Sequence, residues 1–120
     1  MKTKSTQFLI TVTLTRFAGA PPEKLQAEMT AFIEDETRRG TFVVTGGLAP
    51  HPDGARLSLS SGGVERGDAQ LPLQGFAIVE AQSLDKAIAV ASRMLQIHKQ
   101  YVPNWSCDWE VRPIVTPCLP

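Results

Sequence analysis

Apolar and polar residues alternate along the first part of the chain. Phe8, Ile10, Val12 and Leu14 take every second position, and threonines fill most of the positions between them. A period of two places alternate side chains on opposite sides of a strand, and β-branched residues favour this conformation. The pattern predicts a strand over about residues 8–15 with one firmly apolar face.

The pattern then changes to the period of a helix. Apolar residues recur at i, i+4, i+7 and i+8, at Leu25, Met29, Phe32 and Ile33. This spacing gives one apolar stripe along a helix. It predicts a helix over about residues 22–38.

A second helix is predicted after Ser83, a residue type that often accepts hydrogen bonds from the free N–H groups of a first helical turn. Its apolar stripe is wider than that of the first helix and consists of Leu84, Ile88, Val90, Ala91, Met94, Leu95, Ile97 and Tyr101. The wider stripe predicts deeper burial. Pro103 ends this helix, because proline cannot continue the hydrogen-bond ladder.

Three further segments have the character of strands: residues 41–48, 73–80 and 105–112. The middle segment is apolar on both faces, which predicts a central place in a sheet. Between the first two segments, prolines and glycines break the chain and a short alternating run turns back on itself. These features predict a hairpin inserted at about residues 49–72.

The order of these elements predicts an α+β fold, a ferredoxin-like β-α-β-β-α-β unit with an inserted hairpin. Both helices should cover one face of the sheet. The expected core consists of Leu25, Met29, Phe32, Ile88, Ala91 and Leu95 against Phe8, Ile10 and Val12. Because the other sheet face also carries apolar residues, we expect a second copy of the chain to cover it and to form a homodimer.

Composition and charge narrow the possible partners. The chain has 120 residues, the size of one domain, of which 42% are apolar and 20% charged. Its 12 basic and 12 acidic side chains cancel and form no basic cluster, so we expect no nucleic-acid partner. No stretch approaches the roughly 20 apolar residues that a membrane span needs, so we expect no membrane partner.

The two cysteines, Cys107 and Cys118, are too few for a disulfide framework and lack the spacing of metal ligands. We therefore expect reduced thiols in a cytoplasmic protein, with no metal site. Prolines on both sides of Cys118 predict a loose tail at about residues 115–120.

Candidate catalytic residues are few, and no cofactor motif accompanies them. His51 and Asp53 lie two positions apart in a predicted loop, where a histidine oriented by a carboxylate could act as a general base. The alternative is a solvated loop in which Asp53 starts a turn. His98 lies near the end of the second predicted helix and is expected to interact with the helix dipole.

A second set of polar residues follows from the alternation in the first and last predicted strands. The residues that point away from the apolar sides of these strands are Thr11, Thr13, Asp108, Glu110 and Arg112. In a ferredoxin-like sheet they would share the helix-free face, where Arg112 could hold the carboxylate of a ligand in a cavity. The alternative is a pair of opposite charges on a solvated surface.

Four stretches in a fixed order carry a family resemblance. They are Gly-Gly-Leu at 46–48, Gln-Gly-Phe-Ala-Ile-Val-Glu at 74–80, Leu-Asp-Lys-Ala at 84–87 and Trp-Glu-Val-Arg-Pro-Ile at 109–114. Together they resemble the YCII-related proteins, especially the DGPF-type branch. The resemblance covers nearly the whole chain and implies one YCII-related domain over residues 1–120. It also implies a ferredoxin-like fold that dimerises through the open sheet face into an α+β barrel.

The chain departs from this family where an active site has been suggested. The YciI-like members have a suggested His–Asp pair, but the first predicted helix here, residues 22–38, contains no histidine. The Asp-Gly-Pro-Phe motif is also missing, and Val-Glu-Arg-Gly-Asp at residues 64–68 stands near its place. Asp68 is the nearest counterpart of the motif's aspartate.

The residues and the resemblance together favour a small homodimeric binding or accessory module, with a cavity for a small polar or acidic molecule. One alternative is a small enzyme without a cofactor, using acid–base chemistry through His51, Asp53 or Asp68. Another is a structural subunit of a larger complex. A ligand held in the barrel would favour the first hypothesis, and a bell-shaped pH profile of some turnover would favour the second.

Overall fold

The computed structural model describes residues 5–16 and 20–115. Cys118 and the rest of the predicted tail beyond Val115 lie outside the described residues. Within them, two helices and two antiparallel sheets confirm the predicted α+β class. None of the described helices is long and apolar enough to cross a membrane.

The larger sheet has four strands: β1 (Thr6–Arg16), β2 (Phe42–Gly47), β5 (Leu73–Ala81) and β6 (Ser106–Pro113). Their order across the sheet is β2-β5-β1-β6, and every neighbouring pair is antiparallel. The prediction that residues 73–80 take a central place is confirmed, because β5 lies between β2 and β1. Consequently β2 and β6 form the two edges.

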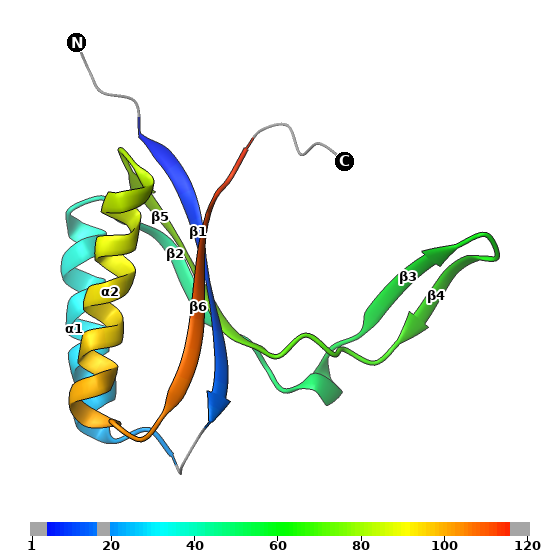
Figure 1. Ribbon diagram of the computed structural model, residues 1–120, viewed down its shortest axis with the longest axis horizontal. Coiled ribbons are helices and arrows are strands. Elements are labelled where there is room, and N and C mark those ends of the chain that lie inside the picture. Colours follow the sequence, from blue (N-terminus) through cyan, green and yellow to red (C-terminus); the bar gives the residue numbers. More distant parts are fainter. Residues whose placement is uncertain (1–4, 17–19, 116–120) are drawn as a thin grey trace.

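Both helices cover the same face of this sheet (Figure 1). The helix α1 (Glu23–Arg38) joins β1 to β2, and α2 (Leu84–Tyr101) joins β5 to β6. Each connection passes over one strand that lies between the two it joins. The start of α2 has the predicted cap, since the hydroxyl of Ser83 accepts a hydrogen bond of 3.2 Å from the backbone N–H of Lys86.

The core lies between the helices and the sheet. Its buried residues are Phe8, Ile10, Phe42, Ala77, Val79, Ala87, Ala91 and Met94, with Met29, Phe32 and Ile33 packed partly buried against them. The prediction that Ile88 belongs to the core is wrong, because this side chain is 42% exposed. The face of α2 that meets the sheet is centred on Ala87 and Ala91, whose small side chains allow a close approach, and Ile88 lies roughly 100° around the helix from Ala87.

The predicted hairpin is present as a separate two-stranded sheet, β3 (Arg56–Ser60) and β4 (Gly63–Gly67). A short 3₁₀ helix, η1 (His51–Asp53), precedes it. We call residues 56–67 the arm, because the hairpin projects from the side of the sheet that is opposite the helices (Figure 1). Among the described elements, β3 and β4 contact only each other. The radius of gyration, 16.6 Å, reflects this projection, since a compact domain of this length has about 14 Å.

Candidate functional site: a pocket at the root of the arm

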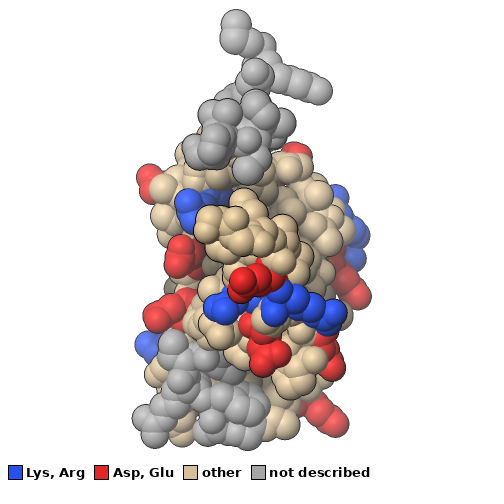
Figure 2. All heavy atoms as spheres, turned by 90° about the vertical axis from the view of Figure 1, so that its right-hand side faces the viewer, with Lys and Arg blue, Asp and Glu red and all other residues tan. Residues whose placement is uncertain are grey.

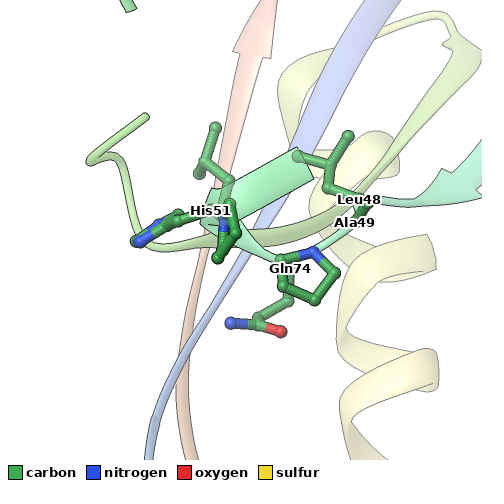
Figure 3. A pocket seen from close by; sticks show the side chains of 7 residues that line it. Leu48, Ala49, His51 and Gln74 are labelled. Carbon is green, nitrogen blue, oxygen red and sulfur yellow. The ribbon is translucent and has the colours of Figure 1, made fainter. Parts of the chain in front are cut away.

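The chain leaves the larger sheet after β2 and returns to it before β5, and the two connections line an open pocket. Its volume is about 590 Å³. The lining comes from residues 48–51 and 53–56 on one side and from residues 69–71 and 73 on the other. Most of these side chains are apolar, and the polar ones are His51, Asp53, Arg56 and Gln70. A smaller cavity of about 380 Å³ adjoins it and shares Leu48 and His51 (Figure 3).

Glycines allow the two strands to meet closely beside this cavity. Gly47 of β2 and Gly75 of β5 are partners across the ladder. A Cβ atom on Gly75 would lie 3.0 Å from the backbone oxygen of Gly46, which is tighter than nine in ten real Cβ contacts. The β2–β5 ladder therefore continues to the point where the two connections diverge toward the arm.

His51 is held by the loop that returns from the arm. Prolines on both sides, Pro50 and Pro52, fix the backbone of η1. The Nε2 atom of His51 lies 2.9 Å from the carbonyl oxygen of Leu71. Because a carbonyl oxygen can only accept, Nε2 carries the proton in this contact, and Nδ1 remains available to a ligand. Figure 3 shows the imidazole and the amide of Gln74 at the edge of the smaller cavity.

The structure does not join His51 to Asp53 by a hydrogen bond. The backbone N–H of Asp53 donates to the carbonyl oxygen of Pro50 at 3.0 Å, so Asp53 helps to close the turn. Its exposed side chain lines the larger cavity. Asp68 is exposed just beyond β4 and is absent from the lining of both cavities. The three candidate catalytic residues therefore lie in one region, but no hydrogen bond joins their side chains into one site.

Arg56 is a site residue that the sequence reasoning missed. Its Nη1 atom donates a hydrogen bond of 2.7 Å to the amide oxygen of Gln70, which ties the first strand of the arm to the returning loop. This partner is neutral, and Arg56 has no ion pair among the described residues. A guanidinium with unused donors thus lines a mainly apolar cavity. Only the path of the loop brings Gln70 to it, so spacing along the sequence gives no signal.

The other predicted site residues lie together on the helix-free face. Across the β1–β6 ladder, Thr11 is paired with Glu110, and Arg112 is paired with Leu9. Thr11 and Thr13 are half-buried, whereas Glu110 and Arg112 are exposed on the edge strand β6. Glu110 and Arg112 form no ion pair with each other. A cavity at this place would need a second wall from another molecule.

The opposite side of β6 packs against α2. The rings of His98 and Trp109 meet edge to face, with centroids 5.5 Å apart, and Nδ1 of His98 lies 2.8 Å from the carbonyl oxygen of Met94. Nε1 of Trp109 is buried without a hydrogen-bond partner among the described residues. Burial raises the pKa of the neighbouring Cys107 thiol, although the Trp109 side chain acts in the opposite direction. These contacts pack β6 against α2.

Within the part of the chain that the structure describes, no three His, Cys, Asp or Glu side chains gather in a way that could hold a metal ion. No protein-family model matches the chain, and no curated protein matches it in sequence.

Proposed function

We propose that the chain is a ferredoxin-like unit of the YCII-related type that forms a homodimer through its helix-free sheet face. The strand order β2-β5-β1-β6 and the two helices on one face support the ferredoxin-like topology. The place of the hairpin, between the second and third strands of that unit, supports the resemblance. Apolar side chains on the helix-free face support the dimer, since Val44 is 44% exposed there and Leu9 and Ile78 are half-buried beside it.

We further propose that this homodimer is a binding module for a small molecule with an apolar body and an anionic group. The observation that carries the proposal is the cavity of about 590 Å³ at the root of the arm. Pockets for small molecules measure roughly 300–1,000 Å³ and combine an apolar lining with a few convergent polar groups. The cavity has this size and this lining.

The polar groups in the cavity specify the anionic part of the ligand. Arg56 binds only the neutral amide of Gln70, so its charge is available to a carboxylate, sulfonate or phosphate. His51 contacts the carbonyl oxygen of Leu71 through Nε2, so its Nδ1 can accept a hydrogen bond from a hydroxyl or N–H group of the ligand. Leu48, Leu71 and Leu73 would contact the apolar body.

A titration with naphthoate, an aromatic carboxylate, tests this function by calorimetry. We expect saturable binding to the wild-type protein and a loss of roughly ten-fold in affinity for Arg56→Gln, because one charge-assisted hydrogen bond is removed. Arg112→Gln is the matched control, since Arg112 is also an exposed arginine but lies on the sheet face. If Arg112→Gln lost affinity and Arg56→Gln did not, the anion would bind on the helix-free sheet face instead. If the wild-type protein bound no naphthoate, the result would contradict the proposal.

A further inference from the structure

The arm has two chemically different faces. In the β3–β4 register, Leu59 is opposite Val64 and Leu57 is opposite Arg66, so these four side chains share one face. Ser58 is opposite Glu65 on the other face. The apolar side chains are very exposed, at 70% for Leu57, 83% for Leu59 and 70% for Val64.

Nothing within the described chain covers the apolar face of the arm. Neither β3 nor β4 contacts another helix or strand of the described structure. A two-stranded hairpin is marginally stable in water unless it packs against something else. A hairpin that exposes two leucines and a valine on one side is therefore expected to bind another apolar surface through that side.

Three observations identify a second copy of the chain as the occupant. First, the arm projects on the same side as the helix-free sheet face, so a copy docked on that face lies alongside the arm (Figure 1). Second, five strand residues span about 16 Å, which exceeds the roughly 10 Å between packed sheets, so the arm reaches past the first layer of the partner. Third, the sheet face that the arm would meet carries apolar side chains of its own, since Val44 is 44% exposed and Leu9 and Ile78 are half-buried.

The charges of the two surfaces are complementary. On the apolar face of the arm the charged side chain is Arg66, because Arg56 and Glu65 lie on the other face of the hairpin. On the sheet face, the β6 edge carries Asp108, Glu110 and Arg112, so two acidic side chains outweigh one basic side chain. Neither acidic residue has an ion pair among the described residues. Figure 2, which looks onto this side of the molecule, shows acidic and basic side chains close together across its middle.

We propose that the arm of each copy clasps the other copy, with Leu57, Leu59 and Val64 on the partner's helix-free face and Arg66 beside the partner's acidic β6 edge. The contact is isologous, because each copy gives one arm and receives one. This inference rests on the homodimer proposed above. It adds that the arm, and not the sheet face alone, holds the dimer together.

Sedimentation velocity over a dilution series tests the clasp. We expect Leu57→Ser with Leu59→Ser to raise the dimer dissociation constant by roughly ten-fold for each leucine, because each loses its apolar burial. The matched control is Ser58→Ala with Glu65→Ala, a cross-strand pair on the other face of the same hairpin. It should leave the dissociation constant unchanged. Circular dichroism should show all these variants folded, since the changed side chains are exposed.

Charge reversal tests the placement of the arm. Arg66→Glu and Glu110→Arg should each weaken the dimer, and their combination should recover most of the loss at low salt. Unchanged association of the double leucine variant would overturn the clasp while leaving the homodimer intact, and failure of the combination to recover would overturn its placement. A wild type that is monomeric would overturn both clasp and homodimer, whereas the naphthoate titration would still test the pocket.

Discussion

Among the described residues, one charged side chain is buried in the small core. Glu36 is 4% exposed although it is charged, and its Oε1 accepts a hydrogen bond of 3.1 Å from Nη1 of Arg93. The guanidinium of Arg93 also lies 4.7 Å from the ring centre of Phe32. The sequence does contain a signal for this network, because Glu36 continues the stripe of Phe32 and Ile33 at helical spacing, where an apolar residue is normal.

The sequence contains one tyrosine, Tyr101, which allows a clean titration. Partial burial raises the pKa of its hydroxyl above 10.0, and so do the charge of Glu28 and the hydrogen bond of 3.3 Å that the hydroxyl donates to it. A pKa raised by folding favours the neutral phenol, so this contribution to stability is present below the pKa of the unfolded chain and is lost as pH rises through the folded one.

Ultraviolet absorbance of the tyrosinate should therefore show a midpoint above pH 10.0 in the folded protein. In Glu28→Gln the midpoint should fall toward that value, because the negative charge is removed. Urea-unfolded protein serves as the reference. A midpoint in the folded wild type at or below that of unfolded protein would show that the Tyr101–Glu28 contact does not form.

At the scale of elements, periodicity along the chain predicted both helices and the four strands of the larger sheet, and the turn residues between them predicted the hairpin. The last strand, predicted at residues 105–112, is observed as Ser106–Pro113, and the second helix ends at Tyr101, before Pro103. Periodicity did not predict correctly which side of α2 faces the sheet. It placed Ile88 on the buried side of α2, where the small residues Ala87 and Ala91 face the sheet.

The glycines of the β2–β5 ladder give a prediction at this scale. Gly75→Ala should lower the free energy of unfolding by about 1–3 kcal/mol, because the new methyl group would meet the backbone oxygen of Gly46 at 3.0 Å. Gly47→Ala is the control, since the nearest atom to its new methyl group, the backbone oxygen of Gln74, would be 3.8 Å away. It should change the free energy by less than about 0.5 kcal/mol in urea unfolding. Equal effects of the two substitutions would contradict the close approach of the strands at Gly75.

The pocket shows why the candidate site was only partly predictable. His51 and Asp53 were predicted to lie in a loop, whereas they form the 3₁₀ helix η1; both line the cavity of about 590 Å³. Their geometry was not predictable, because the partner of His51 is a carbonyl oxygen 20 residues further along, at Leu71. Arg56 and Gln70 are likewise joined only through the path of the returning loop. Contacts set by loop conformation leave no periodic pattern in a sequence.

At the scale of the whole molecule, both helices cover one face of the larger sheet (Figure 1). The arm projects on the other side, where it contacts no other helix or strand of the described chain. Exposed apolar residues occur on both the arm and the helix-free face, at Leu59, Val44 and Leu48 for example. Zero net charge opposes association weakly. These features support the homodimer proposed above, in which the pocket at the arm root would lie close to the second copy.

The mass of the protein in solution is the most direct test of this account. Light scattering during size-exclusion chromatography at micromolar concentration should give twice the 13.1 kDa of one chain. Dilution should shift the dimer toward monomer without unfolding, because the core of each copy is complete on its helical side. A mass of 13.1 kDa at every concentration would contradict the homodimer on which the account depends.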